Sequence, residues 1–130
     1  MPSIFTKIIK GEIPCHKVAE DDDHIAFLDI NPNAKGHTLC VPKKEVDKIW
    51  DMEKEEYLKL MDFSYKVAQA IESSVSCERV GMTVIGLEVP HVHVHLIPLN
   101  SMQNATFQHK VSLQTEEFEE IAQRIGEHLR

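Results

Sequence analysis

This 130-residue sequence lacks paired cysteines, long apolar runs and clusters of positive charge, and each absence excludes a class of protein. Its three cysteines, Cys15, Cys40 and Cys77, lie far apart, and none forms a C-x-x-C pair. That spacing argues against a disulfide framework and against a cysteine-rich zinc site. Reduced thiols fit a cytosolic protein best, so the sequence predicts a cytoplasmic location.

The N-terminus and the charge distribution exclude further classes. The first residues, MPSIFTKIIKGEIP, contain too short an apolar stretch for a signal peptide or a membrane span, so no membrane association is expected. The formal net charge is −7, and Lys and Arg do not cluster. Sequence-independent nucleic-acid binding depends on neutralising phosphates, so no nucleic-acid partner is expected. A small phosphorylated ligand, held by histidines and backbone amides, is compatible with this charge.

The length and the hydrophobic patterns predict a single α+β domain over residues 1–130. A short helical turn should end at Gly11 and Pro14. Five β-rich stretches predict strands, at residues 16–20, 24–30, 37–42, 79–86 and 91–99. Apolar residues at three- and four-residue spacing predict helices over residues 51–75 and 115–130. Neighbouring strands with short links indicate an antiparallel sheet with helices packed on it.

Both longer helices have a recognisable apolar stripe and start. The stripe of the first consists of Tyr57, Leu60, Met61, Val67, Ala68, Ile71 and Val75. The stripe of the second consists of Phe118, Ile121, Ala122, Ile125 and Leu129. Acidic residues near the start of the first helix suit the positive end of the helix dipole, and Thr115 is the expected N-cap of the second.

The segment PHVHVHLIP, residues 90–98, has a histidine at every second position over five residues. If it is a strand, three imidazoles share one face: His91, His93 and His95. The core should then receive Val92, Val94 and Leu96. Three imidazoles on one face of an apolar strand are unfavourable unless each has a partner. The explanations to weigh are hydrogen-bonded structural histidines, a metal site and a phosphoryl-transfer site.

A metal site is one explanation, because two imidazoles of an H-x-H pair can converge on one ion. A cupin-type site would also need a glutamate shortly afterwards, and residues 96–101 contain no acid. The helix predicted over residues 51–75 would interrupt a continuous β-barrel. Metallohydrolases built on barrels need about twice this chain length.

Nucleophilic catalysis at phosphorus is the other functional explanation. A neutral imidazole can attack a phosphoryl group and form a covalent intermediate that water then hydrolyses. A hydrogen bond to its second ring nitrogen fixes the reactive tautomer. Flanking histidines can donate hydrogen bonds to the phosphoryl oxygens as charge develops. Three alternating imidazoles supply one nucleophile and two supporting groups.

The segment HVHVHLI resembles the signature of the histidine triad (HIT) superfamily, and its small Hint-like bacterial branch in particular. IFTKIIKGEIP, FLDINPNAKGHTLCVPKKE and VPHVHVHLIP extend the resemblance over most of the chain. It implies a HIT-like α+β fold: a five-stranded antiparallel sheet with one long helix and a C-terminal helix, paired as a homodimer. It also implies a nucleotidyl hydrolase or transferase that acts at the α-phosphate of a purine nucleotide and needs no cofactor.

The resemblance implies a role for individual residues. His93 would be the nucleophile that becomes nucleotidylated, and His91 and His95 would orient it and contact phosphate. His37 matches the fourth histidine of the family, and Asp29 the acid that hydrogen-bonds the ribose hydroxyls. The other implied nucleotide-binding positions, which could equally be core residues, are Ile4, Phe5, Ile8, Phe27, Leu28, Ile30, Glu88 and Val89. The histidines that match nothing are expected at the surface: His16, His24, His109 and His128.

Two departures from the family pattern are visible. Many bacterial relatives bind structural zinc at positions that hold Ser3, Thr6 and Glu45 here, so no bound metal is expected. The link before the triad is short, and it has Leu87 in place of a glutamine and Glu88 in place of a hydroxyl. An ionised carboxylate cannot donate a hydrogen bond to a leaving group.

The sequence thus predicts a metal-independent, phosphoramidase-like HIT hydrolase that acts on a nucleoside phosphoramidate or dinucleotide through a nucleotidyl-His93 intermediate. Two alternatives stay open. The short link favours a nucleotide-binding regulatory module with little turnover, and the histidine spacing also suits a metalloprotein that uses the same residues.

Overall fold

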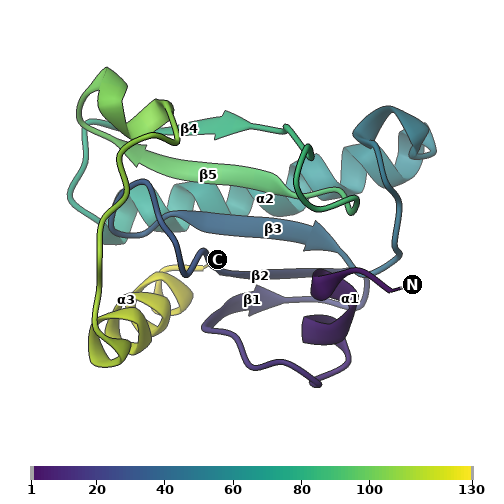
Figure 1. Cartoon of the computed structure of the whole chain (residues 1–130), viewed down its shortest axis with the longest axis horizontal. Coiled ribbons are helices and arrows are strands. Elements are labelled where there is room, and N and C mark those ends of the chain that lie inside the picture. The colour runs from purple at the N-terminus through teal and green to yellow at the C-terminus, as the bar shows by residue number, and fades with distance from the viewer. Residues whose placement is uncertain (1, 130) are drawn as a thin grey trace.

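The structure is a computed structural model and describes residues 2–129. Its centre is a five-stranded antiparallel sheet in the order β1-β2-β3-β5-β4 (Figure 1). The strands are β1 (Lys17–Glu20), β2 (His24–Leu28), β3 (Thr38–Pro42), β4 (Arg79–Thr83) and β5 (Val94–Leu99). The predicted α+β class and its antiparallel sheet are confirmed.

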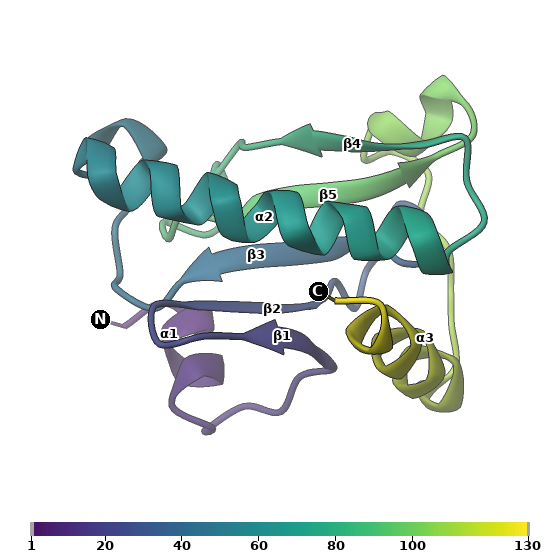
Figure 2. The same cartoon turned by 180° about the vertical axis from the view of Figure 1, so that it is seen from behind.

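Helices cover the two faces of the sheet unequally. The helices are α1 (Ile4–Ile9), α2 (Lys54–Ser74) and α3 (Thr115–Glu127), with 3-10 turns η1 (Ile49–Asp51) and η2 (Met102–Ala105). Figure 2 shows α2 and α3 in front of one face, and Figure 1 shows α1 on the opposite side. Among residues 2–129, no helix has both the length and the apolar character needed to span a bilayer.

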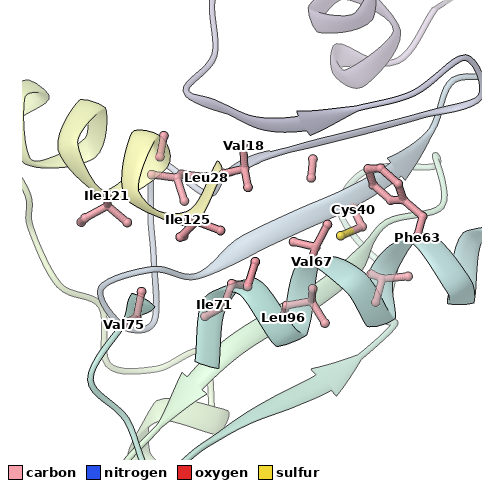
Figure 3. Packing of buried hydrophobic residues seen from close by; sticks show 14 of the residues in the cluster. Val18, Leu28, Cys40, Phe63, Val67, Ile71, Val75, Leu96, Ile121 and Ile125 are labelled. Carbon is pink, nitrogen blue, oxygen red and sulfur yellow. The ribbon is translucent and has the colours of Figure 1, made fainter. Parts of the chain in front are cut away.

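The face covered by α2 and α3 contains the main core, which we call the helix-face core. Cys40 and Leu96 lie beside Val67 of α2, whereas Leu28 lies beside Ile125 of α3 (Figure 3). Buried stripe positions follow the prediction: Leu60, Val67, Ile71, Val75, Phe118, Ile121, Ala122 and Ile125. Full burial of such a side chain stabilises the fold by about 1.5–3 kcal/mol. The other stripe positions are only partly buried: Tyr57, Met61, Ala68 and Leu129.

The opposite face contains a smaller apolar cluster, which we call the histidine-face cluster. Its buried members are Phe5, Ile25, Phe27, Leu39 and Val41. Because side chains alternate along a strand, Ile25 and Phe27 of β2 lie in this cluster while Ala26 and Leu28 lie in the helix-face core. Alternation therefore makes the two faces of the sheet chemically distinct.

Strands β2 and β4 end two and three residues earlier than predicted and α2 begins three residues later, and two further predicted details are wrong. Thr115 is the first residue of α3 and not its N-cap; Gln114 is the cap, and its backbone N–H donates to Glu117 Oε1 at 3.0 Å. The fifth strand begins at Val94 and not at residue 91. Before it, the His91 N–H bonds to the Val89 carbonyl and the Val92 N–H to the Val46 carbonyl, so these residues lie outside the β5 pairing.

His24 is a third correction, because it is buried and not at the surface. It precedes Ala26 and Leu28 by even steps along β2, so it faces α2. There its ring stacks on Phe63 with centroids 5.0 Å apart, and its Nδ1 lies 2.9 Å from Asp21 Oδ1. The other unassigned histidines differ among themselves. His16 is half-buried against Phe118, whereas His109 and His128 are exposed as predicted.

Candidate active site

Four buried histidines form the candidate site on the face opposite the helix-face core. His91, His93 and His95 come from the end of the link before β5 and from β5 itself. His37 precedes β3, whose residue Leu39 pairs with His95 in the sheet. The expected core positions Val92, Val94 and Leu96 are buried in the helix-face core. The alternation inferred from the sequence therefore holds through the triad, although the strand starts late.

A backbone carbonyl sets the tautomer of His93. The Nδ1 atom of its ring lies 2.7 Å from the carbonyl oxygen of His91. A carbonyl oxygen can only accept, so Nδ1 carries the proton and Nε2 keeps its lone pair. The ring also contacts the edge of Phe5, with centroids 4.9 Å apart. In the neutral ring this tautomer leaves Nε2 unprotonated, the form that a nucleophile requires.

His91 is fixed in the opposite tautomer. Its Nε2 donates to the carbonyl oxygen of Pro42 at 2.8 Å, which leaves Nδ1 as an acceptor. Nδ1 lies 2.6 Å from the hydroxyl of Ser3, which donates to it. The Ser3 oxygen accepts the backbone N–H of Thr6 at 3.1 Å as the N-cap of α1. Burial lowers the pKa of His91, so this imidazole is neutral at pH 7.

His37 and His95 form a chain of tautomers that starts at a backbone amide. The N–H of Asn33 donates to His37 Nδ1 at 3.0 Å, so the proton of His37 is on Nε2. That Nε2 lies 3.0 Å from His95 Nδ1 and donates to it, which places the proton of His95 on Nε2. Burial lowers the pKa of His37 to about 3 and that of His95 to about 4. Both rings are therefore neutral at pH 7.

Two ring nitrogens of the four histidines have no hydrogen-bond partner within residues 2–129. They are the Nε2 of His93, which carries a lone pair, and the Nε2 of His95, which carries a proton. Neither is among the fully enclosed unpaired atoms, so both are open to solvent. One nucleophilic nitrogen beside one N–H donor is the pair that attack on a phosphoryl group requires.

Asp29 joins the site through His37. Its Oδ2 lies 3.7 Å from His37 Nε2, and its Oδ1 accepts the N–H of Asn31 at 2.8 Å. Burial raises the pKa of this carboxyl above its ordinary value. The carboxylate lies at the turn between β2 and β3, where it borders the histidines.

The remaining positions taken from the family pattern differ in burial and in the face of the sheet on which they lie. Phe5 and Phe27 are buried and meet edge to face with ring centroids 5.6 Å apart, while Ile8 and Val89 pack partly buried against the same cluster. Three of the positions are exposed: Ile4, Ile30 and Glu88. Leu28 lies in the helix-face core, on the other side of the sheet from the histidines, because it follows Phe27 by one residue.

The residues at the family's zinc positions do not fit a zinc ion. Ser3 and Thr6 offer hydroxyls, whereas structural zinc prefers thiolate and imidazole ligands. These side chains bond to one another instead: Glu45 Oε1 accepts the Thr6 hydroxyl at 2.6 Å and the Ser3 backbone N–H at 2.8 Å. A hydrogen-bond network therefore tethers α1 to His91.

A second group of potential metal ligands brings Asp29, His37 and His95 within 4.8 Å of one another. The His37 Nε2–H already donates to His95 Nδ1, and the lone pair on His37 Nδ1 accepts the backbone N–H of Asn33. A metal ligand must present an unprotonated nitrogen to the ion. The tautomers held here do not suit a shared ion.

Sequence reasoning missed three residues beside the triad. Asn33 positions His37, and Phe107 lies edge to face with His95 at 4.9 Å between centroids. Lys110 lies over the Phe107 ring. Asn33 could have been noticed four residues before His37 in the loop NPNAKGH, but residues 100–114 have no periodicity that would have identified the other two.

Comparisons with known proteins agree with this geometry. A family model described as the HIT domain matches residues 10–102. An uncharacterized HIT-like protein of Borreliella burgdorferi is 34% identical over 132 residues, 95% of each chain. The adenosine 5′-monophosphoramidase of Schizosaccharomyces pombe is 38% identical over 99 residues, 75% of this chain and 74% of that protein.

The solved structures give the same result. The crystal structure of a Hit-like protein from Bartonella henselae, described as involved in cell-cycle regulation, has a TM-score of 0.86 and 33% identity. The match covers 98% of this chain and 96% of that one. With the buried triad, the sheet order and the matched residues in agreement, this chain belongs to the HIT (histidine triad) family.

Proposed function

We propose that this protein is a nucleotide hydrolase that acts at the α-phosphate of a nucleoside phosphoramidate or dinucleotide through a nucleotidyl-His93 intermediate. The open Nε2 of His93 carries the proposal, because the His91 carbonyl keeps the ring proton on Nδ1. The family supports it, as does similarity to adenosine 5′-monophosphoramidases of S. pombe and Saccharomyces cerevisiae. The S. cerevisiae match is 40% identical over 96 residues, 73% of this chain and 61% of that protein.

In the first step, His93 Nε2 attacks the α-phosphorus, so a P–N bond forms as the bond to the leaving group breaks. The Nε2–H of His95 donates a hydrogen bond to the departing atom, which takes its proton from solvent, and the proton that the attacking water loses in the second step is returned to solvent. In the second step, water attacks phosphorus, the P–N bond breaks, and the nucleoside monophosphate leaves. Neutral flanking rings keep a positive charge away from the attacking nitrogen and so preserve its lone pair.

The nucleoside would bind beside Asp29 and the histidine-face cluster. A carboxylate can accept hydrogen bonds from both ribose hydroxyls. The purine would contact apolar side chains next to Phe5 and Phe27, with Ile4, Ile8, Ile30 and Val89 at the margin. Leu28 is not part of this proposed pocket, because it lies in the helix-face core on the other side of the sheet.

We also propose a two-fold homodimer. Strand β4 has a neighbour on one side only, so its outer edge is open to a second chain (Figure 1). Large apolar side chains are exposed near that edge and on α2, among them Met82 and Tyr65. An isologous interface would cover both. Sedimentation at micromolar concentration should give roughly twice the chain mass of 14.9 kDa, and a monomer would contradict the proposal.

Hydrolysis of adenosine phosphoramidate by wild type, His93→Ala and His128→Ala tests the enzyme. His93→Ala should lower kcat/KM by about a thousand-fold or more, the scale seen when a covalent nucleophile is removed. His128→Ala removes an exposed imidazole and should have no effect. Near-normal turnover by His93→Ala would remove this residue from the proposed role.

Two further experiments distinguish the hydrolase from a metalloprotein and from a nucleotide-binding regulatory module. Dialysis against a chelator should leave the rate unchanged, because the zinc positions hold hydroxyls and a carboxylate. Loss of activity that zinc restores would favour a metalloprotein. Tight nucleotide binding without turnover by the wild-type protein would favour a regulatory module.

A further inference from the structure

The loop that joins β5 to α3, residues 100–114, places a lysine beside the histidines. The Nζ of Lys110 donates to the side-chain oxygen of Asn33 at 2.8 Å and lies 4.9 Å from the centroid of the Phe107 ring. An amide oxygen and an aromatic face both attract an ammonium group, so its position is defined on two sides. Neither contact neutralises its charge.

Both supports of this ammonium contact the buried histidines. Asn33 is 1% exposed, and its backbone N–H donates to His37 Nδ1. The Phe107 ring lies edge to face with His95 and His37, at centroid distances of 4.9 and 6.0 Å. The position of Lys110 is therefore coupled to His37 through Asn33, and to both His37 and His95 through Phe107.

Backbone and side-chain bonds fix the loop itself. The N–H of Val111 donates to the Pro32 carbonyl at 3.0 Å, and the side-chain nitrogen of Asn33 donates to the Asn104 carbonyl at 2.8 Å. Phe107 has a φ of 63°, in the left-handed region that a bulky residue rarely adopts. Strain of this kind persists only where surrounding contacts hold it, so the loop is fixed over the site.

The groups around the site supply little positive charge apart from Lys110. The chain has a net charge of −7, and burial lowers the pKa values of His37, His91 and His95, so these rings bring no positive charge at pH 7. Among residues 2–129, no acid lies within ion-pair distance of Lys110, whereas Lys43 and Lys66 are each paired. The charge of Lys110 adds to burial in lowering the pKa values of His37 and His95, and it opposes the burial that raises the pKa of Asp29.

We propose that Lys110 binds the phosphate oxygens of the nucleotide and supplies the positive charge that the neutral histidines lack. The inference rests on the proposed nucleotide site and names a further substrate-binding residue in it. An ammonium has three N–H donors, and Asn33 takes one of them. The remaining donors are available to an anion above His95. Lys110 therefore distinguishes a phosphorylated nucleoside from an unphosphorylated one.

Calorimetric titration with AMP and with adenosine tests this role. Lys110→Gln removes the charge but keeps a side chain that can donate a hydrogen bond, and Lys110→Arg keeps the charge. Lys66→Gln is the matched control, because Lys66 lies on α2 across the sheet and changes the net charge equally. Lys110→Gln should weaken AMP binding by about tenfold, the size of a charge-assisted hydrogen bond, and leave adenosine binding unchanged. Lys110→Arg should retain most of the AMP affinity.

The outcomes separate this inference from the proposed function. Equal AMP affinity in Lys110→Gln and wild type would overturn it, and so would an equal loss in Lys66→Gln, which would indicate a general charge effect. A parallel loss of adenosine affinity would show that Lys110 only supports the loop. Failure of wild-type protein to bind AMP would overturn this inference and the proposed nucleotide site together. AMP binding that depends on Lys110, without hydrolysis of phosphoramidate, would support the inference and refute the hydrolase.

Discussion

The two faces of one sheet in this protein use alternate residues of the same strands for different purposes. Along β2, Ala26 and Leu28 enter the helix-face core, while Ile25 and Phe27 enter the histidine-face cluster. The first face is closed by α2 and α3. Among the helices of residues 2–129, the second face is covered by the short helix α1, and it supports four imidazoles. A period of two thus gives a small chain a stable side and a chemically active side.

The difference between the faces lies in how polar atoms are satisfied. On the histidine face, ring nitrogens bond to a carbonyl, a hydroxyl, a backbone N–H or one another. The exceptions are the Nε2 atoms of His93 and His95, which we assign to the substrate. Burial of polar groups is tolerated when they are paired, so the unpaired atoms indicate where chemistry occurs. Mutations on the two faces should therefore affect different measurements.

The largest expected effect of a single substitution on stability comes from the helix-face core. Leu60 of α2 is 0% exposed, so Leu60→Ala removes buried methyl groups and leaves a cavity. The free energy of unfolding should fall by about 3 kcal/mol, within the range for such substitutions. Urea titration gives that value, and kcat measured well below the unfolding temperature should stay unchanged.

Leu58→Ala is the control on the same helix, because Leu58 is 52% exposed. It should cost far less than Leu60→Ala. Similar losses at the two positions, or a fall in kcat for folded Leu60→Ala, would mean that the faces are not separable in the way argued.

Acid should destabilise the protein through the histidine face. His37 and His95 have pKa values lowered to about 3 and about 4, against 6.5 for the ordinary imidazole. The unfolded chain therefore binds protons first as the pH falls below 6.5. The part of the free energy of unfolding that depends on these two neutral rings is fully present above that pH and is lost as the pH falls toward 4. Between pH 7.5 and pH 5 we expect a loss of roughly 2 kcal/mol for each of the two rings, about 4 kcal/mol together, since one unit of pKa shift corresponds to about 1.4 kcal/mol.

Urea titrations across this pH range check the acid effect. The His95→Gln variant should show a shallower fall in stability, because one titrating group is gone. His128→Ala, at an exposed site, should keep the wild-type slope. A wild-type stability that stays constant from pH 7.5 to pH 5 would contradict the neutral, buried state that we assign to the triad.

The parts of the fold predicted from the sequence are those set by local periodicity. Leu60 and Ile71 recur at helical spacing and are buried as expected. The start of β5 was placed too early, because the alternation of the triad begins at His91 while pairing with β3 begins only at Val94 and pairing with β4 at His95. There the Val92 N–H bonds instead to the distant carbonyl of Val46, a contact that no local pattern encodes.

The same distinction applies to the candidate site. The histidines were found because alternation and family resemblance both indicated them. Lys110 and Phe107 were missed because long-range contacts position their loop, among them the bond from Val111 N–H to the Pro32 carbonyl. His24 was misplaced for a different reason. A stack on Phe63 of α2 satisfies a buried imidazole that sequence alone assigns to the surface.

The smallest predicted effect is at Ser3, which links α1 to the triad. Its hydroxyl donates to His91 Nδ1 at 2.6 Å and accepts the Thr6 N–H at 3.1 Å. Ser3→Ala should lower kcat about three- to tenfold and the free energy of unfolding by about 1 kcal/mol, the cost of one hydrogen bond or N-cap. Ser3→Thr, which keeps the hydroxyl, should recover most of both, and Ser76→Ala, at an exposed serine, should change neither. An unchanged kcat in Ser3→Ala would show that the Pro42 carbonyl alone orients His91. A loss of stability as large as that of Leu60→Ala would show that the polar network, and not only the apolar core, supports the fold.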